Sequence, residues 1–562
     1  MTDKVAGIVI IGGGPVGLGL ALDLAWRGQP SMLVERDPRT AAVLLAKANG
    51  LHERTIETCR RWGILDEVIK RGFPQDLPGD SVYCTSLTGH VLGRSVIQST
   101  RDRPQPPQSP VKRQRCPQYE FDPLLADEVR RLGLTDLRYG QEFVGFEQDN
   151  DGVTVHLRAP GTDTATSVRC DYLVACDGAG SLTRRQLGVP FEGRMLDFSV
   201  SAMIRIHDLA SLHPIEDGER YILMGPEGAW GSMVWVDGDK IWRFSIVGNR
   251  EKIDPEHFDI DPEIRRALGS DDVKFEILRV MPWRRSQCVA ASYRCGRVLL
   301  AGDAAHTTSP TGGHGMNTGI ADAVDLAWML DAIQSGWGGD GLLTAYDLER
   351  RPVGIRNSAS AARNYGNWMD RDGCVDVLSD GPEGEACRRK IGERLQSSLH
   401  AEWHTLGIEL GFRYENSPII VPDGSPPTAD DGSDYIQAAR PGHRAPHVWL
   451  ADGRSTLDLF GRGFVLLQLR DIDEDADLLV REARAVAMPI ELVQLREAAV
   501  LDLYQSALVL VRPDGQVAWR SDTLPQDSAY LIDTVRGMHV HGMPGTRTRR
   551  RTLSINAVAD SG

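Results

Sequence analysis

The residues with the clearest chemical potential lie in glycine-rich loops that each follow a short apolar run. Gly12-Gly13-Gly14-Pro15-Val16-Gly17 follows Val5–Ile11, and Gly302-Asp303 opens a second loop after Val298–Ala301. A glycine-rich turn between a strand and a helix exposes backbone N–H groups and the positive end of the helix dipole. Each loop is therefore suited to hold a polyanion or the polar edge of a ring.

The first loop belongs to a complete βαβ pattern. A helical periodicity runs from Leu18 to Arg27, and a second strand, Ser31–Val34, ends at Glu35. The GxGxxG spacing with an acidic residue after the second strand is typical of dinucleotide binding. The three glycines of the motif permit, in order, a tight turn, close approach of a pyrophosphate and close packing of the helix. Glu35 can accept a hydrogen bond from a ribose hydroxyl.

Composition and charge restrict the class of protein. The chain has 562 residues, 41% of them hydrophobic and 25% charged, which predicts several globular domains. The net charge of −15 argues against a nucleic-acid partner, because counterion release needs clustered basic residues. No apolar run is long enough for a membrane span and the first residues do not resemble a signal peptide, so we expect a cytoplasmic protein without a membrane partner.

The nine cysteines are scattered, odd in number and free of any CxxC pair. This pattern predicts neither a disulfide framework nor a metal site, and it favours a reducing compartment.

Changes in pattern along the chain predict its domains. Strands follow one another without helices between about Phe191 and Trp283, and an α/β pattern returns after Pro441. We expect a discontinuous dinucleotide-binding domain (1–75, 105–190 and 285–370), an inserted antiparallel-sheet domain (76–104 and 191–284), a helical or irregular connection (371–435), a small α/β domain (436–545) and a disordered tail (546–562) that carries the basic run Arg547–Arg551.

Three stretches together carry a family resemblance: GGGPVG (12–17), CDGAGSLTR (176–184) and GDAAHTTSPTGGHGMN (302–317). They resemble the fingerprints of the class A single-component FAD-dependent aromatic hydroxylases, the group of para-hydroxybenzoate hydroxylase and phenol hydroxylase. The resemblance covers about residues 5–365. The terminal domain resembles the thioredoxin-like domain of the larger members, which hydroxylate phenols and aromatic polyketides, but it lacks CxxC and no redox role follows.

The resemblance implies an α/β fold: a Rossmann-like FAD-binding domain with an inserted antiparallel-sheet substrate domain and a C-terminal thioredoxin-like domain. It assigns FAD to Gly12, Gly14, Pro15, Val16, Gly17, Glu35, Arg36, Lys47, Gln118, Asp177, Gly178, Arg184, Gly302, Asp303, Pro310, Gly313, Gly315, Met316 and Asn317. Within this set, Asp303 is expected to bind the ribityl chain, and the backbone amides of Met316 and Asn317 to face the isoalloxazine ring. Asp177 and Arg184 are linked to both FAD and NAD(P)H.

The implied activity is hydroxylation of an electron-rich phenolic or aromatic polyketide substrate with NAD(P)H and O2, through a flavin C4a-hydroperoxide. The protein must exclude water and raise the electron density of the substrate. The alternatives are Baeyer–Villiger oxygenation or epoxidation with the same cofactor, a two-component arrangement with a separate reductase, and a non-catalytic flavin-binding module. The expected partners are the aromatic substrate, O2 and NADH or NADPH, with a homodimer as the expected assembly.

The resemblance names few catalytic groups. Pro310 matches a proline beside the reacting ring, and Lys47 replaces an arginine that binds the FAD phosphates in several relatives. Asn49 stands where phenol hydroxylase has an aspartate thought to assist phenol deprotonation. Because an amide is no base, His52 is the candidate substitute.

Substrate contacts are predicted for the inserted sheet and the third fingerprint: Met224, Gly231, Met233, Trp235, Pro310, Thr311 and Gly312. Met233 and Trp235 fall roughly where para-hydroxybenzoate hydroxylase places its polar carboxylate clamp. Since large apolar side chains cannot bind a carboxylate, we expect a phenol that is bulkier and less charged than a benzoate.

Overall fold

The computed structural model describes residues 7–38, 47–162, 164–207, 218–249, 251–254, 257–369 and 373–539. The start of the predicted first strand, at Val5, and the predicted disordered tail with its basic run lie outside these ranges. None of the helices in these ranges is long and apolar enough to cross a membrane.

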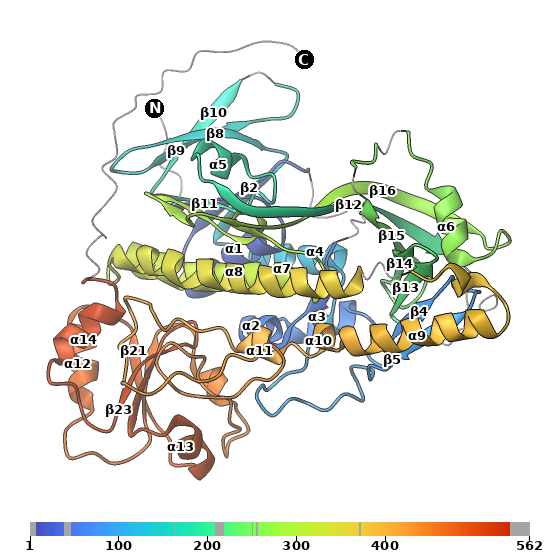
Figure 1. Cartoon of the computed structure of the whole chain (residues 1–562). Helices are drawn as coiled ribbons and strands as arrows, with labels where there is room; N and C mark the ends of the chain where they lie inside the picture. Colours follow the sequence, from blue (N-terminus) through green and yellow to red (C-terminus); the bar gives the residue numbers. More distant parts are fainter. Residues whose placement is uncertain are drawn as a thin grey trace.

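A six-stranded sheet with the order β17-β18-β11-β1-β2-β7 organises the first domain (Figure 1), and all of its strand pairs except β17–β18 are parallel. The strands are β1 (Ile8–Ile11), β2 (Ser31–Glu35), β7 (Thr135–Tyr139), β11 (Tyr172–Ala175), β17 (Arg294–Cys295) and β18 (Val298–Leu300). Every residue of β1, β11 and β18 is buried, as expected for strands covered on both faces.

Different layers cover the two faces of this sheet. Ile8 and Ile10 pack against the helices α1 (Pro15–Arg27), α4 (Gln118–Leu132) and α7 (His314–Gln334). Val9 and Ile11 pack against a three-stranded sheet of β8 (Glu142–Gln148), β9 (Val153–Arg158) and β10 (Ala165–Cys170). The remaining elements of this part are α2 (Glu53–Trp62), α3 (Leu65–Arg71), α5 (Leu182–Gln186), and a small sheet of β3 (Gly50–Leu51) and β6 (Gln114–Arg115).

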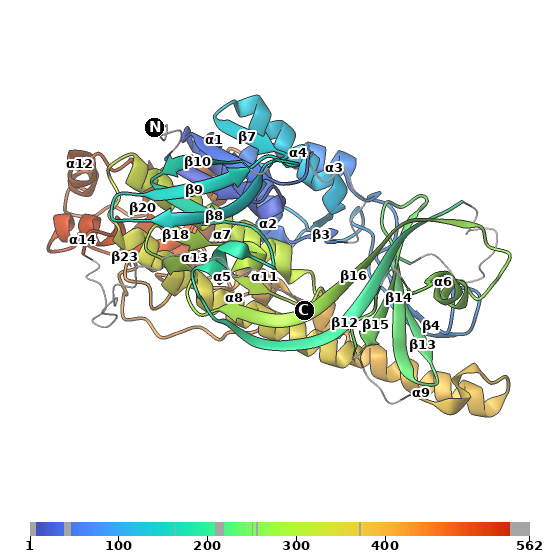
Figure 2. The same ribbon diagram turned by 90° about the horizontal axis from the view of Figure 1, so that it is seen from above.

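An eight-stranded sheet with the order β19-β16-β12-β15-β14-β13-β4-β5 extends to one side of the molecule, and β12 and β16 are its two longest strands (Figure 2). Its strands are β4 (Ser81–Cys84), β5 (Val91–Ser95), β12 (Phe191–Ile206), β13 (Arg220–Gly225), β14 (Gly228–Trp235), β15 (Ile241–Asn249), β16 (Phe275–Ala290) and β19 (His306–Thr307). All neighbours are antiparallel except β13 and β4. Segments far apart in the chain therefore share one sheet.

The two faces of the eight-stranded sheet have different partners. One face is apolar and packs against α6 (Asp261–Leu268) through residues such as Tyr221, Trp242 and Phe244. The opposite face carries Tyr83, Ile222 and other residues that contact the end of α8 (Gly341–Trp368) and α9 (Pro382–Ser398). The strand period of two residues sends neighbouring side chains to these different environments.

The connection between the second and third domains contains helices rather than strands. After α9 follow α10 (His400–Trp403) and α11 (Leu406–Leu410), and the 3-10 turn Val375–Leu378 precedes α9. The structure pairs Cys374 with Cys387 as a disulfide, with a Cα–Cα distance of 6.1 Å. The expectation that the cysteines form no disulfide is therefore wrong at this pair, because chain reversal between the 3-10 turn and α9 brings together two residues whose spacing has no recognisable motif.

The C-terminal domain is a four-stranded sheet with helices. The sheet order is β21-β20-β22-β23, with β20 and β21 parallel and the other pairs antiparallel. Its elements are β20 (Phe464–Gln468), α12 (Asp477–Ala485), β21 (Ile490–Gln494), α13 (Ala498–Tyr504), β22 (Leu508–Val511), β23 (Val517–Ser521) and α14 (Ser528–Val535), after the 3-10 turn Thr456–Leu459. The expected α/β fold class is confirmed.

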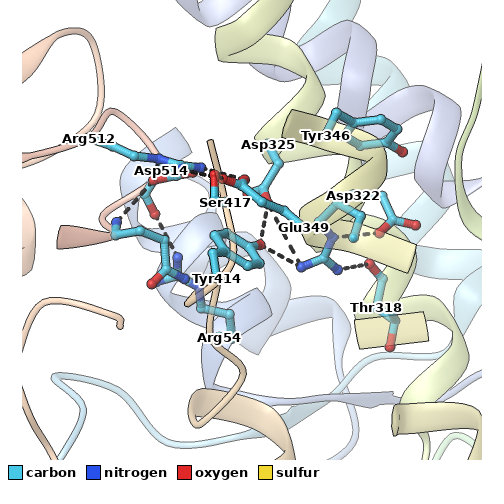
Figure 3. A network of polar contacts seen from close by, with 12 residues as sticks. Arg54, Thr318, Asp322, Asp325, Tyr346, Glu349, Tyr414, Ser417, Arg512 and Asp514 are labelled. Carbon is cyan, nitrogen blue, oxygen red and sulfur yellow. Dashed lines mark hydrogen bonds and ion pairs between the residues drawn. The ribbon is translucent and has the colours of Figure 1, made fainter. Parts of the chain in front are cut away.

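A buried ionic network joins this domain to the first (Figure 3). The Arg512 guanidinium donates to both carboxylate oxygens of Glu349 on α8, at 2.6 and 2.9 Å, and also pairs with Asp514. The next residue of α8, Arg350, donates to Asp322 on α7 at 2.8 Å. These charges are fully buried, so each needs its partner to be tolerated.

A cavity of about 610 Å³ lies between α2 and the C-terminal domain. Its lining includes Trp26, Arg61, Asp458 and Phe464, and none of the residues of the three fingerprints. It is therefore separate from the site built from those fingerprints.

Candidate active site

The turn after β1 shows why glycine is required at two of its positions. Gly12 has φ +110°, and a Cβ there would lie 2.3 Å from the carbonyl oxygen of Cys176. A Cβ at Gly17 would lie 2.0 Å from the carbonyl oxygen of Gly12. Gly14, the second glycine of the GxGxxG motif, has no heavy atom within 4 Å of its Cβ position and leaves open space beside the start of α1.

The N-terminus of α1 is prepared for an anion. Gly14 is the N-cap, Pro15 follows at the first helical position, and the first turn has neither a side-chain cap nor an acidic residue. The Glu35 carboxylate accepts the N–H of Gly13 at 2.6 Å, which fixes the acidic group next to the turn. Unsatisfied N–H groups at this helix start match a pyrophosphate.

The second fingerprint is hydrogen-bonded to the third. Asp177 Oδ2 accepts the N–H and the hydroxyl of Thr183 at 3.1 and 3.0 Å, while its Oδ1 is buried without a partner. Arg184 donates to the carbonyl oxygen of Ala304 at 2.8 Å and lies over the ring of Phe191 at 3.7 Å. Gly178 has φ +79° and nothing within 4 Å of its Cβ position. The stretch therefore places one unsatisfied carboxylate oxygen beside the Gly302 loop.

The third fingerprint begins with a 3-10 turn at Gly302–Ala304. The Gly302 N–H donates to Asp322 at 3.0 Å, and its Cβ position lies 2.8 Å from Val16 of α1, so this loop and the first are in direct contact. Asp303 is exposed, yet the surrounding protein raises the pKa of its carboxyl, which His306 and Lys47 lower in part. The resemblance predicts that this carboxylate binds the ribityl chain, and the contact stays a prediction.

The N-terminus of α7 is the second open helix start of the site. Gly313 caps it with φ +71° and no side-chain cap, and the first turn has no acidic residue. The Asn317 amide donates to the carbonyl oxygens of Gly50 and Gly313 at 3.0 and 2.7 Å, and its oxygen accepts the His52 N–H at 2.8 Å. The side chain of Asn317 joins three segments. The backbone N–H groups at the start of α7 stay available to bind the edge of a ring.

Gln118 is buried at the start of α4 and donates to Asp122 at 2.9 Å. Burial raises the pKa of Asp122 to about 7, against the Gln118 hydrogen bond and the nearby Lys47, which lower it. Lys47 and Arg36 are exposed. The assigned polar residues are thus present in the described part of the chain, and their contacts with FAD stay predictions.

The two candidate bases have different surroundings. His52 is buried, and its Nε2 lies 3.0 Å from the carbonyl oxygen of Gly312, which requires a proton on Nε2. Burial lowers the pKa of His52 to about 3, so the ring is neutral and a poor proton acceptor at neutral pH. The Asn49 side-chain nitrogen is buried without a hydrogen-bond partner, and the main-chain carbonyl oxygen of Asn49 accepts the Cys116 N–H at 2.8 Å.

Met233 and Trp235 lie on the face of the eight-stranded sheet that is covered by α6. Met233 is fully buried in the apolar cluster there, and Trp235 stacks on Trp242 with a centroid distance of 5.5 Å. Their role in lining the substrate site stays a prediction, and it requires a substrate on the α6 side of the sheet. Met224 lies on the opposite face, and Gly231 allows close approach to the Ser245 carbonyl oxygen.

The face opposite α6 carries arginines that sequence reasoning missed. Arg220, Val234 and Arg243 are direct cross-strand neighbours in β13, β14 and β15. Arg243 donates to the carbonyl oxygen of Lys47, and burial with Arg220 and Arg115 nearby lowers the pKa of Arg243 to about 10. Alternation in β15, where Arg243 stands between Trp242 and Phe244, was the sequence signal for this face.

Arg115 of β6 completes this group. It pairs with Glu219 at 2.9 Å, and its side chain keeps 15% of its surface accessible. Burial lowers the pKa of Arg115 to about 10, and its Nη1 is buried without a hydrogen-bond partner. Near Lys47, the face opposite α6 therefore carries arginine side chains in addition to its apolar residues.

Comparison with known proteins places this geometry in a class. Residues 5–361 match the family model described as FAD binding domain, and residues 438–538 match the model described as aromatic-ring hydroxylase, C-terminal. The protein is thus a flavoprotein whose two open helix starts and glycine turn fit the phosphates and ring of FAD. It belongs to the FAD-dependent aromatic-ring hydroxylases, a class of monooxygenases.

Relatives along almost the whole chain support this membership. Tetracenomycin B2 monooxygenase-dioxygenase of Streptomyces olivaceus is 33% identical, with 94% of this chain and 97% of the relative covered. 4-Methyl-5-nitrocatechol 5-monooxygenase of a Burkholderia species is 32% identical, with the same coverage. A chromopyrrolic acid-soaked RebC structure with bound 7-carboxy-K252c superposes with a TM-score of 0.87 at 37% identity, covering 95% of this chain and 99% of RebC.

Proposed function

We propose that this protein uses NAD(P)H and O2 to hydroxylate a polycyclic or substituted phenol that carries an acidic group. Membership of the hydroxylase family supports the reaction, and one observation supports the acidic group: Arg243 is partly buried beside Arg220 and Arg115 and has no ion-pair partner among the described residues. The acidic group differs from the expectation of a less charged phenol, which rested on Met233 and Trp235.

The argument from Arg243 is energetic. Among the residues that the structure describes, no carboxylate lies within ion-pair distance of Arg243, and its printed partner is one carbonyl oxygen. A partly buried cation without an ion-pair partner loses hydration that one carbonyl oxygen replaces only in part. A carboxylate or phenolate that docks there would compensate it, since an arginine fork matches a planar anion.

The relatives are consistent with an acidic substrate but do not require it. The RebC complex contains 7-carboxy-K252c, whose name includes a carboxyl group, whereas the aklavinone-11 hydroxylase complex contains aklavinone. We therefore take a fused-ring phenol with a carboxylate as the substrate class.

The described residues divide the work between two sides of the site. The open starts of α1 and α7 hold the phosphates and the ring edge of FAD, and Asp303 holds the ribityl chain. FAD supplies the redox chemistry when bound. On the other side the sheet presents Arg243 and Arg220, which orient the anionic group, while the protein around them excludes water.

The use of O2 and of NADH or NADPH is part of this proposal, and so are a homodimer and a cytoplasmic location. A panel of phenols scored by the ratio of NAD(P)H consumed to hydroxylated product identifies the substrate and tests the reaction. Oxidation of NAD(P)H with peroxide release alone, for every aromatic in the panel, would contradict it.

The acidic group is tested with Arg243→Met. We expect the variant to bind 1-hydroxy-2-naphthoate at least about tenfold more weakly than the wild type, because one charge partner is lost. Binding of 1-naphthol, which lacks the carboxylate, should change little. The measurement is titration calorimetry on the FAD-loaded protein.

The matched control is Arg205→Met, near the end of β12 in the same sheet, where the arginine pairs with Glu276 and both side chains are partly exposed. It should bind both naphthalene compounds as the wild type does. Equal weakening of both compounds by Arg243→Met would show that the arginine has a packing role only.

A further inference from the structure

Three buried polar atoms without hydrogen-bond partners surround Gly312, in the loop between Pro310 and α7. They are Nε2 of His314, Nδ2 of Asn364 and Oε2 of Glu402, and each of these residues is at least nine-tenths buried. A Cβ at Gly312 would lie 2.7 Å from the His314 atom and 3.1 Å from the Asn364 atom. Buried polar groups without partners are rare, and three around one glycine indicate that something polar binds there.

Glu402 is held in place by the oxygen that does have partners. Its Oε1 accepts the Gly312 N–H at 3.3 Å and a 2.6 Å hydrogen bond from Arg220. Arg220 in turn lies over the ring of Trp403 at 4.8 Å. The carboxylate is therefore fixed between the sheet and the loop, with its second oxygen unpaired.

The three unpaired atoms complement a hydroxyl group. The Asn364 amide offers a donor for the hydroxyl oxygen, and the Glu402 oxygen offers an acceptor for the hydroxyl proton. Burial lowers the pKa of His314 well below its usual range, so its ring is neutral and can donate or accept. A buried carboxylate oxygen without a donor costs more free energy than an unpaired atom of a neutral group. Among the three atoms, Oε2 of Glu402 therefore gains most from a bound O–H.

We propose that this cluster is the binding site for a phenolic hydroxyl of the substrate and that Glu402 is the residue that accepts its proton. The inference rests on the proposed function and assigns the base that accepts the phenol proton in the proposed reaction. The substrate O–H bond breaks, an O–H bond forms on Glu402 Oε2, and the electron pair stays on the substrate oxygen. The resulting phenolate is more electron-rich at its ring carbons and remains next to the Arg220 cation.

The other candidates are less suited to this task. His52 has its Nε2 occupied by the Gly312 carbonyl oxygen, and its pKa near 3 leaves it neutral. Asn49 has no basic atom. Glu402 is an acidic residue whose carboxylate contacts the loop of the third fingerprint directly, and it comes from the helical connection, which has no sequence fingerprint.

The test compares a phenol with its methyl ether. Dissociation constants of 1-hydroxy-2-naphthoate and 1-methoxy-2-naphthoate are measured by calorimetry on the FAD-loaded wild type and on Glu402→Gln. We expect the wild type to bind the ether about 10- to 100-fold more weakly, because the ether leaves the Glu402 oxygen unpaired. In Glu402→Gln the ratio should fall to within about threefold, because glutamine can donate to an ether oxygen.

Glu57→Gln is the matched control. Glu57 is also a buried carboxylate with an arginine partner, Arg444, but it lies on α2 at the C-terminal domain. It should keep the wild-type ratio. A ratio that is unchanged in Glu402→Gln would overturn the proposal, because a purely steric rejection of the methyl group does not depend on the charge at Glu402.

A second variant covers the case in which Glu402→Gln does not fold. Asn364→Leu removes the donor to the hydroxyl oxygen and should weaken binding of the phenol; phenol binding equal to that of the wild type would contradict the proposed site. Failure of this inference is distinguishable from failure of the proposed function: in the first case the wild type binds both naphthoates equally but still hydroxylates a phenol with NAD(P)H, and in the second it hydroxylates none.

Discussion

Asp122 is a carboxyl group that should titrate near neutral pH. Burial raises its pKa from the usual 3.8 to about 7, and Gln118 is its hydrogen-bond donor. Between these two pH values the folded protein keeps the proton and the unfolded chain has lost it. The stability that Asp122 contributes is therefore complete below about pH 4 and is lost as the pH rises through 7.

Asp122→Asn should remove this pH dependence. A difference of about three pKa units corresponds to roughly 4 kcal/mol in the free energy of unfolding, as an order of magnitude. Urea unfolding of the wild type and the variant at pH 4 and pH 8 measures it. If both proteins lost the same stability between the two pH values, Asp122 would not be the titrating group.

Asp303 allows a direct test of the flavin side of the site. Asp303→Ala should fold but lose FAD, because it removes an exposed carboxylate that supports no described hydrogen bond of the fold. Flavin absorbance per protein after gel filtration is the measurement, and Asp136→Ala, at an exposed aspartate of β7, is the control. A fully yellow Asp303→Ala protein would contradict the assignment.

Single residues differ in how far the sequence reveals them. Gly12 and Gly17 are predictable because a positive φ and a backbone contact demand glycine, and those demands leave a spaced motif. Glu402 and Arg115 leave none, because their function depends on contacts with Gly312 and Glu219 that only the tertiary fold creates. Substrate-side chemistry is therefore harder to read than cofactor-side chemistry.

At the level of elements, α1 and the turn before it make a paired prediction. Gly17→Ala should destabilise the protein by about 1–3 kcal/mol or more, because its Cβ would lie 2.0 Å from a backbone oxygen that cannot move freely. Gly14→Ala should fold almost as well as the wild type, since its Cβ meets no protein atom, yet it should bind FAD more weakly.

Thermal unfolding of the two apoproteins and FAD titration measure the pair. The opposite pattern, an unstable Gly14→Ala protein with normal FAD affinity in Gly17→Ala, would mean that the roles of the two glycines are reversed.

Strands differ in how clearly their sequence shows which face is buried. In β9 every second residue is buried, and the apolar residues of its sequence alternate in the same way. In β14 and β15 both faces are covered, by α6 on one side and by other parts of the chain on the other. Hydrophobic alternation then indicates a strand without showing which face meets the substrate.

For the whole molecule, Arg512 should determine how firmly the C-terminal domain is attached. Arg512→Met leaves Glu349 and Asp514 buried without their cation, so we expect a loss of about 3–5 kcal/mol in the free energy of unfolding. Calorimetry measures the loss. The control is Arg520→Met, whose partner Asp423 is partly exposed and where the loss should be small.

A Tm of Arg512→Met equal to that of the wild type would show that the network contributes no net stability.

The general architecture could be predicted without knowledge of these contacts, because three glycine-rich fingerprints and alternating strand and helix patterns define it. The interface between domains was beyond sequence reasoning, since Glu349 and Arg512 are 163 positions apart.

The 28-residue helix α8 passes both the ionic network and the proposed hydroxyl site. It is about 42 Å long, and it runs across the middle of the molecule (Figure 1). Glu349 on it meets the C-terminal domain, and Asn364 on the same helix meets Gly312. Anyone building chimaeras with related hydroxylases should therefore exchange the C-terminal domain together with α8, because the helix that contacts this domain also carries Asn364 of the proposed hydroxyl site.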